Sequence, residues 1–447
     1  MPRFLLFAVV FIEGFCSLGA EVIALRQIIP HLGSSIVVTA PTIGFFLLAL
    51  ALGYHAGSKI DGRFREVVAR NFLLAAVLTG VGLAGVAVDL LFAYLKPPGL
   101  AYLFFVAGVL CPIAWLLGQT VPILTNLLHH DRVGKASGEA LYWSTLGSFL
   151  GSLSLSLLVM QWLGVSAAVA LCALLLVVGF VLLRARRWAT VIASLIVVAL
   201  TGVANAWLRP EIETAHASYL VLPVNYDGAV NGRALKNNSS VASLIDDSQP
   251  PRYARYIRHI RSLLLDDLAW HGRQILVLGA GGFTLSHGEP RNHYTYVDID
   301  PAVRAIAEKL FLGQEARGTF IADDARRFVV RSEQRFAAVI VDVYGSHSSI
   351  PGHLVTREFW QATRRVLDPE GLLIANLILD SALATPYSRN LLATIESVYG
   401  RCAVDVLQKQ QVLANVVVTC RNGPLPEPAR LFVDERNAAD FDLARSR

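Results

Sequence analysis

Apolar residues run almost unbroken through the first half of the chain and become interrupted in the second half. Seven segments up to about Trp207 are apolar over the roughly 20 residues that a helix needs to cross a bilayer. They cover residues 4–29, 36–57, 72–94, 100–128, 140–161, 164–183 and 188–207. The pattern therefore predicts a membrane bundle of about seven helices over residues 1–209.

Three of these segments carry further signals. The fourth contains Pro112 and Pro122 and is expected either to be kinked or to end as an interfacial piece. The fifth contains small residues over 147–152, which allow close helix contacts in lipid, so we expect it inside the bundle. Charged residues at Glu13, Glu21 and Arg26 fall within the first segment. An ion pair between Glu21 and Arg26 is one interpretation, and a transport role is the other.

Composition agrees with a membrane protein. Hydrophobic residues make up 54% of the 447 residues, charged residues 16%, and the mean hydropathy is +0.51. The net charge of +5 does not indicate nucleic-acid binding, because the basic residues cluster in short loops between apolar segments. These are Lys59, Arg63, Arg65, Arg70, Arg132, Lys135, Arg184, Arg186 and Arg187. The pattern predicts a multi-pass protein of the cell (inner) membrane.

The positive-inside rule makes the basic loops and the N-terminus cytoplasmic. Seven spans would then place the second half of the chain outside the cytoplasm, whereas a nucleoside co-substrate is ordinarily cytosolic. The sequence leaves both orientations of the second half open.

The second half alternates between short apolar runs and amphipathic segments. Residues 210–250 contain the turn signals Asp227-Gly228 and Asn231-Gly232 and are expected to form small β-hairpins. A domain over 251–425 follows, and 426–447 would be a C-terminal tail. The expected strands of the domain over 251–425 are 274–278, 294–298, 318–322, 337–342 and 371–377, and its expected helices are 252–268, 301–311, 325–331, 356–367 and 385–399. This alternation predicts a mostly parallel, Rossmann-like sheet of the methyltransferase type.

Candidate binding residues follow the predicted strands. Gly279 and Gly281 form a glycine turn after the first strand, and Asp298 ends the second strand 19 residues later. Asp324 and Asp342 follow the third and fourth strands. Ligands of such sheets bind beyond the carboxyl ends of the strands, so Asp298 could accept ribose hydroxyls and Asp324 an exocyclic amine of adenine. Alternatively, each acid only caps the following helix, as we expect of Asp300 before Pro301.

The cysteines contain no metal-ligand spacing, and we expect no metal. Two strands are expected at 402–407 and 414–420, forming an antiparallel hairpin at the sheet edge, with Cys402 and Cys420 facing each other. A disulfide would form if the domain meets an oxidising compartment; otherwise the two thiols stay free.

Four motifs resemble those of the spermidine synthase (polyamine aminopropyltransferase) family. They are Leu278-Gly-Ala-Gly-Gly282, Val297-Asp-Ile-Asp-Pro301, Ala322-Asp-Asp-Ala325 and Val341-Asp-Val-Tyr344, preceded by Arg252-Tyr-Ala-Arg-Tyr256. The resemblance covers roughly residues 213–420. The first half, with Gly14-Phe-Cys-Ser-Leu-Gly-Ala-Glu21, resembles the multi-spanning region of membrane-fused members of that family.

The resemblance implies a role for each candidate residue. Decarboxylated S-adenosylmethionine, or S-adenosylmethionine itself, would be a co-substrate rather than a permanently bound cofactor. The residues that would hold it are Gly279, Gly281, Asp298, Ile299, Asp324 and Ala325. Asp342 would be the general base, and Tyr256 and Tyr344 would line the groove for an amine acceptor. The expected partners are the lipid bilayer and a small amine, with room for a homo-oligomer.

Three positions depart from the family pattern and keep alternatives open. The glycine turn continues into Gly282 and Phe283 where the family has an acid, Gly345 replaces a second acid, and Ile257-Arg258 replaces His-Glu. An amine substrate is a cation that carboxylates recognise. A transferase with another acceptor or a methyl transfer, and a non-catalytic nucleoside or polyamine sensor or transporter accessory, are therefore the alternatives to aminopropyl transfer.

Overall fold

The computed structural model shows two compact units, residues 1–31 with 38–215 and residues 32–37 with 216–447. The structure describes residues 3–33, 36–60, 62–127, 133–184, 188–207, 212–214, 216–225, 231–238, 240–344, 350–421, 432–434 and 437–446. The turn signal at 227–228, Gly345, and the basic residues at 132, 186 and 187 lie outside these ranges.

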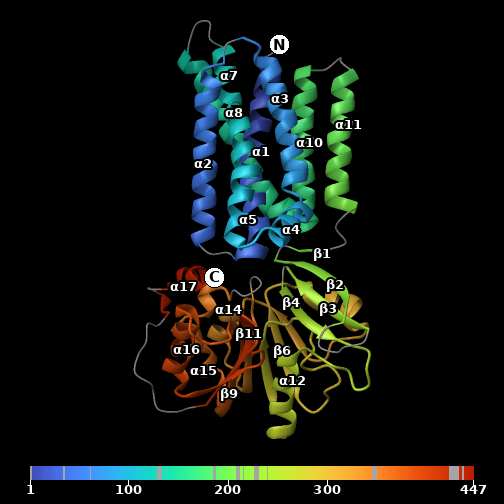
Figure 1. The fold of residues 1–447 in the computed structure, drawn as a ribbon, viewed down its shortest axis with the longest axis vertical. Coiled ribbons are helices and arrows are strands. Elements are labelled where there is room, and N and C mark those ends of the chain that lie inside the picture. Colours follow the sequence, from blue (N-terminus) through green and yellow to red (C-terminus); the bar gives the residue numbers. More distant parts are fainter. Residues whose placement is uncertain are drawn as a thin grey trace. The chain divides into compact units, whose positions relative to one another are not determined.

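The first unit is a helical bundle (Figure 1). Within the described residues, six of its helical stretches are long and apolar enough to cross a membrane, and a bent pair raises the number to seven if it forms one span. The first elements are α1 (Arg3–Leu32), α2 (Ile36–Ser58), α3 (Phe64–Val77), η1 (Leu78–Gly82), α4 (Gly85–Tyr94), α5 (Pro98–Phe105), η2 (Val106–Leu110) and α6 (Cys111–Gly118). They are followed by α7 (Thr120–Leu127), α8 (Val133–Ser154), η3 (Leu155–Val159), α9 (Met160–Leu163), α10 (Val165–Arg184), α11 (Trp188–Gly202), η4 (Val203–Trp207) and the short strand β1 (Ile212–Glu213).

The third predicted segment differs most from its expected form. Its helix begins at Phe64, eight residues earlier than expected, and bends by 66° between η1 and α4. Gly80, Gly82 and Gly85 surround the bend, and glycine weakens a helix interior because it gains most freedom on unwinding. The fourth segment forms one candidate span, Pro98–Asn126, whose α-helical hydrogen bonding is interrupted by a π-turn. The π-turn η2 directly precedes Pro112, which has no amide hydrogen to continue the ladder.

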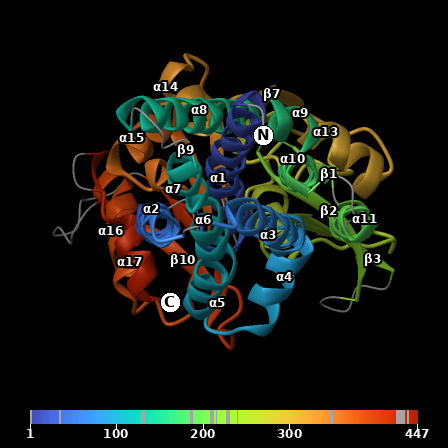
Figure 2. The same ribbon diagram turned by 90° about the horizontal axis from the view of Figure 1, so that it is seen from above.

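The interior helix of the bundle is α1, and the expectation for the fifth segment is wrong in part. Two-thirds of the most apolar window of α1 is buried, against 22% for residues 134–163, which contain α8. Figure 2 shows α1 surrounded by α8, α10, α3 and α6. Only one strip of α8 is buried: a Cβ on Gly147 or Gly151 would collide with the backbone of Phe11 or Phe15 on α1. The small residues therefore permit a close contact without making α8 central.

Polar groups of α1 contact several elements of the bundle. Ser144 donates a 2.9 Å hydrogen bond to Glu13, and Arg26 donates to the Thr214 carbonyl oxygen at 3.4 Å. The expected ion pair between Glu21 and Arg26 is absent from the described part of the chain. Residues five apart on a helix point about 140° away from each other, which explains the difference.

The second unit has a seven-stranded sheet in the order β10-β11-β9-β8-β5-β6-β7. Its strands are β5 (Gln274–Leu278), β6 (His293–Asp298), β7 (Thr319–Ala322), β8 (Phe336–Val341), β9 (Leu367–Asp380), β10 (Cys402–Val406) and β11 (Leu413–Cys420). The pairs among β5 to β9 are parallel, while β11 pairs antiparallel with both β9 and β10. The Rossmann-like sheet and its terminal edge hairpin are thus confirmed.

Each face of this sheet is covered by a hydrophobic core. One core includes Trp360, Phe359 and Leu391, and the other includes Phe311, Ile260 and Tyr296. The helical elements are α12 (Arg255–Ser262), η5 (Leu263–Asp267), α13 (Val303–Ile306), η6 (Ala307–Leu312), α14 (Ala325–Arg331), η7 (Gly352–Leu354), α15 (Arg357–Arg365), α16 (Pro386–Tyr399) and α17 (Ala439–Ser446). The predicted tail thus contains a helix, α17. All six residues of β8 are buried, which is typical of a central parallel strand.

Two hairpins were expected from turn signals and facing cysteines. The strands β2 (Ser218–Val224), β3 (Gly232–Asn237) and β4 (Ser240–Ile245) pair antiparallel, which confirms small hairpins before the main domain. On the terminal hairpin Cys402 is paired in register with Cys420. Their Cα atoms are 4.3 Å apart and their sulfur atoms form a disulfide, while Cys16, Cys111 and Cys172 are free thiols.

Candidate active site

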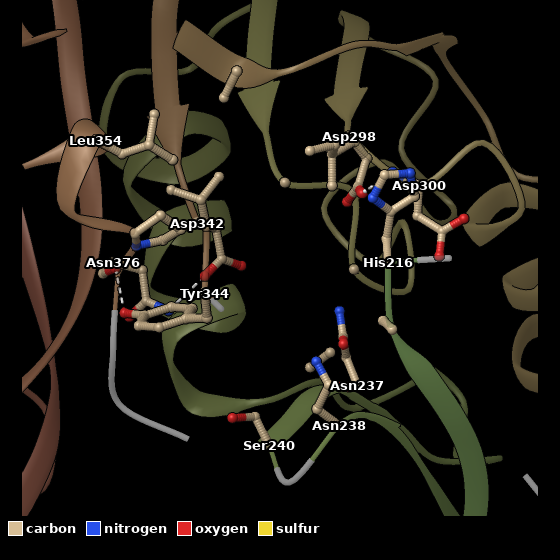
Figure 3. Close-up of a pocket in the computed structure, with 18 of the residues that line it drawn as sticks. His216, Asn237, Asn238, Ser240, Asp298, Asp300, Asp342, Tyr344, Leu354 and Asn376 are labelled. Carbon is tan, nitrogen blue, oxygen red and sulfur yellow. Dashed lines mark hydrogen bonds between the residues drawn. The ribbon is translucent and has the colours of Figure 1, made fainter. Parts of the chain in front are cut away.

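A pocket of about 280 Å³ lies at the carboxyl ends of the parallel strands of the second unit (Figure 3). Such a sheet edge is where ligands of doubly wound folds bind. All nine residues that the sequence nominates line this one pocket: Tyr256, Gly279, Gly281, Asp298, Ile299, Asp324, Ala325, Asp342 and Tyr344. The fold thus brings together residues spread over almost 90 positions of the sequence.

One wall of the pocket is built around Asp342, directly after β8. The Tyr256 hydroxyl donates to Asp342 Oδ2 at 2.9 Å, and Asn376 Nδ2 donates to Oδ1 at 2.8 Å. Asn376 is oriented in turn, because its side-chain oxygen accepts a 3.0 Å bond from Asn415 and its backbone oxygen accepts a 2.6 Å bond from the Tyr344 hydroxyl. The carboxylate is therefore held in one orientation by neutral donors.

The protonation of Asp342 reflects this environment. Burial raises its pKa to about 6, while the hydrogen bonds from Asn376 and Tyr256 act in the opposite direction. The same surroundings, together with the Asp342 charge, raise the pKa of the Tyr256 hydroxyl well above its usual value. At neutral pH Asp342 is thus an anion that can accept a proton, and Tyr256 remains a donor.

The glycine turn lies next to this wall. Gly279 has φ +92°, and a Cβ there would lie 2.1 Å from the Asp342 backbone oxygen. Gly281 also has a positive φ of +51°, and the Gly282 amide donates to Ser243 Oγ at 2.8 Å. Only glycine combines this backbone conformation with so close an approach of two strand ends. Gly279, Gly281 and the Asp342 carboxylate thus line the same pocket.

The opposite wall carries Asp298, at the end of β6, with His216 beside it in Figure 3. Asp298 Oδ2 accepts from the Ala280 amide at 2.9 Å and Oδ1 from the Asp300 amide at 3.0 Å. Burial raises the pKa of Asp298, and the two amides oppose the shift. Each oxygen keeps a second lone pair for a ligand hydroxyl. The adjoining Ile299 side chain is 53% exposed and offers an apolar surface to a flat ring.

Two other acids line the pocket and also bond to the backbone beside them. Asp324 caps α14 by accepting from the Arg327 amide at 2.8 Å, and its other oxygen lies 3.2 Å from His353 Nε2. Capping and pocket lining are thus compatible at Asp324, because a carboxylate has lone pairs for both tasks. The expected cap at Asp300 is wrong: its side chain accepts from the Ala302 amide at 2.9 Å, which closes a turn, and α13 begins after it at Val303 without a side-chain cap.

Several lining residues were missed from the sequence. His216, Tyr219 and Asn415 come from hairpin strands or the segments beside them, and no motif distinguishes them. Asn376 had a recognisable signal, since it is a buried polar residue within an apolar strand. Among the described residues no group of three or more His, Cys, Asp or Glu side chains could hold a metal ion. The geometry suits a nucleoside on the Asp298 side and a proton transfer at Asp342.

Several known proteins are similar to the chain over most of its length. It is 26% identical over 414 residues to polyamine aminopropyltransferase 1 of Streptomyces coelicolor, covering 83% of this chain and 75% of that protein. It is 25% identical over 439 residues to the polyamine aminopropyltransferase of Mycobacterium tuberculosis, covering 88% and 81%. A shorter match to that of Vibrio vulnificus is 35% identical over 135 residues, and it spans 28% of this chain but less than half, 44%, of that protein.

No family model matches the chain. A solved structure of a probable spermidine synthase from Corynebacterium glutamicum is similar with a TM-score of 0.41 and 21% identity, covering 47% of this chain and 79% of that one. The motifs around the pocket and the relatives that align along both halves of the chain indicate the same similarity. The chain is therefore similar to the polyamine aminopropyltransferases, which are spermidine synthase-like transferases.

Proposed function

We propose that this protein is an integral-membrane transferase that moves an aminopropyl group from decarboxylated S-adenosylmethionine to an amine acceptor. The observation that carries the proposal is the Asp342 carboxylate, which is held by Tyr256 and Asn376 at the edge of a nucleoside-sized pocket. The names of the relatives support the same chemistry.

The donor's nucleoside end fits the wall opposite Asp342. The free lone pairs of Asp298 accept the ribose hydroxyls, and Ile299 packs on the adenine ring. Asp324 accepts the exocyclic amine of adenine while it continues to cap α14. The sulfonium centre would lie in the pocket beside Gly279 and Gly281, between this wall and Asp342.

The reaction is a displacement at the carbon next to the sulfonium sulfur. The acceptor nitrogen forms a bond to that carbon, the carbon–sulfur bond breaks, and its electron pair remains on the sulfur of a neutral thioether nucleoside. The proton released by the nitrogen passes to Asp342. Positioning and proton removal are sufficient for such a step, because the leaving group is already activated by its positive charge.

A second candidate function is transfer from intact S-adenosylmethionine, or transfer to a different acceptor. The observation in its favour is that the described glycine turn carries no acidic side chain. Gly282 has none, and Phe283 is buried against Tyr296. A carboxylate at this turn would bind the amino group of an aminopropyl chain. The lack of such a carboxylate at the described turn weakens recognition of the decarboxylated donor. Which donor the protein uses therefore distinguishes the two candidate functions.

The full-length protein in detergent or nanodiscs tests this choice. Each donor is supplied with a panel of mono- and diamines, and both products are measured by mass spectrometry. We expect the decarboxylated donor to yield one aminopropylated amine for each thioether nucleoside released. Methylated products from intact S-adenosylmethionine would establish the second candidate instead. Binding of either donor without any product would indicate a non-catalytic binding domain.

A further inference from the structure

A second hollow lies in the helical unit, at the end of the bundle where α3 begins. It has a volume of about 600 Å³ and is lined by α3, the end of α10 and the start of α11. These three helices lie side by side in both views of the fold (Figures 1 and 2). In Figure 1 the N-terminus lies at this end too. The hollow is therefore where the bundle would meet the membrane surface.

The rim of this hollow is basic. Among the residues that the structure describes, Arg63, Arg70 and Arg184 line it together with a single acid, Glu66. The Arg184 guanidinium lies 3.9 Å from the Glu66 carboxylate, with 35% and 57% of the two side chains exposed. One acid cannot neutralise three guanidinium groups, so these four described side chains together carry a net charge of +2. Such a rim attracts an anion, and guanidinium groups match the geometry of phosphate oxygens.

The inner wall of the hollow is apolar. Leu73, Phe180, Ala189 and Ala193 line it together with the arginines. Outside it, Val191 and Ile192 on α11 are 51% and 55% exposed, as expected of a surface that faces lipid chains. The Thr190 hydroxyl is buried and donates to the Arg184 carbonyl oxygen at 3.2 Å, which fixes the end of α10 to the start of α11. The hollow thus combines a cationic rim with an apolar wall.

We propose that this hollow binds the phosphodiester headgroup of an anionic phospholipid, with an acyl chain along its apolar wall. A free phosphate would use the arginines but leave Leu73 and Phe180 uncovered, so charge and apolar surface together favour a lipid. Basic pockets between membrane helices recognise acidic headgroups by this combination. The site is independent of the proposed transferase reaction, because its residues belong to the helical unit alone.

Native mass spectrometry of the full-length protein tests this proposal. The delipidated protein is supplied with equal amounts of phosphatidylglycerol and phosphatidylcholine, and the retained lipid is counted. We expect wild-type protein to retain phosphatidylglycerol selectively. Arg70→Gln with Arg184→Gln should weaken retention by about 25-fold, at about fivefold per arginine, whereas the same two positions changed to Lys should retain most of it. Arg65→Gln is the matched control, since Arg65 is exposed on α3 outside the hollow.

The proposal is overturned if the two lipids are retained equally, or if the double Gln variant retains phosphatidylglycerol like wild type. Complete displacement of phosphatidylglycerol by millimolar inorganic phosphate would also overturn it, because it would mean that the apolar wall contributes nothing. The Lys variant separates these results from misfolding, since it keeps both charges at the same positions.

Discussion

The Tyr256 hydroxyl donates a 2.9 Å hydrogen bond to the Asp342 carboxylate, although the two residues are 86 positions apart. Tyr256 belongs to α12 and Asp342 follows β8, so the bond joins the helix before the sheet to the centre of the sheet edge. It stabilises the ionised form of Asp342 against the upward shift in pKa that burial causes. Together with the hydrogen bond from Asn376, the bond therefore lowers the pH at which the proposed base works.

Tyr256→Phe should move the pH dependence of turnover upward. Asp342 must be ionised to accept a proton, so its contribution to the rate appears as pH rises through its pKa of about 6. Without the Tyr256 donor the anion is less stable, and the midpoint should rise by about one pH unit. Deprotonation of the acceptor amine affects both proteins equally, so the difference between their profiles reports Asp342. Tyr253→Phe is the control, since its hydroxyl bonds to His287 instead; an unshifted Tyr256→Phe profile would refute the assignment.

Asp324→Asn should weaken donor binding before it affects the chemical step. An asparagine side chain also caps a helix, so α14 should remain folded. The amide replaces one acceptor oxygen with a donor, which faces the exocyclic amine of adenine unfavourably. Calorimetry of the full-length protein should show about tenfold weaker donor binding. Asp323→Asn, at a neighbour outside the pocket, should bind like wild type; equal affinities for all three proteins would remove Asp324 from the donor site.

Breaking the disulfide should destabilise the second unit. Cys402 and Cys420 close a loop of 18 positions, and a bridge of that span contributes about 3 kcal/mol to the free energy of unfolding. For a unit of this size, Cys402→Ser should lower the melting temperature by roughly 6–12 °C. A reducing agent should lower the wild-type melting temperature similarly. Cys111→Ser, at a free thiol of the other unit, is the control; an unchanged melting temperature for Cys402→Ser would show that the bridge does not constrain the unfolded chain.

The basic end of the bundle should be cytoplasmic. The N-terminus lies at one end of the bundle, where α3 also begins, whereas α4 lies at the other end (Figure 1). The positive-inside rule makes the basic end cytoplasmic. With seven spans, the transferase domain would then be on the non-cytoplasmic side, where disulfides persist. With Cys111 changed to Ser, an impermeant thiol reagent applied to intact cells should label Tyr94→Cys but leave Arg63→Cys unlabelled. The reverse labelling would contradict this orientation.

The sequence predicts local elements of the soluble domain well because its helices and strands differ in period. Gln274–Leu278 and Ala325–Arg331 were located to the residue, since a buried β-branched run and a capped amphipathic helix are distinct patterns. The glycine turn and the acids at the strand ends also located the pocket, because ligands of such sheets bind beyond the carboxyl ends of the strands. The partners of Asp342 were not predictable in full, because Asn376 and Asn415 meet through the pairing of β9 with β11 rather than through a motif.

The membrane half was less predictable in detail. Lipid is as apolar as the bundle interior, so hydropathy does not distinguish a central helix such as α1 from a peripheral one such as α8. The break after Gly82 was likewise hidden, because the residues on both sides of it are apolar. Arg26 was expected to pair with Glu21, but helix geometry directs the two side chains apart.

Asp342→Asn gives the most direct test of the proposed mechanism when donor binding and turnover are measured on the same preparation. Asparagine preserves the shape of the side chain but cannot accept the proton, and loss of a positioned base costs about 10²–10⁴-fold in rate. The variant should therefore bind decarboxylated S-adenosylmethionine with nearly wild-type affinity while transfer to any amine falls by at least about 10²-fold. Wild-type turnover by Asp342→Asn with any amine acceptor would contradict the mechanism.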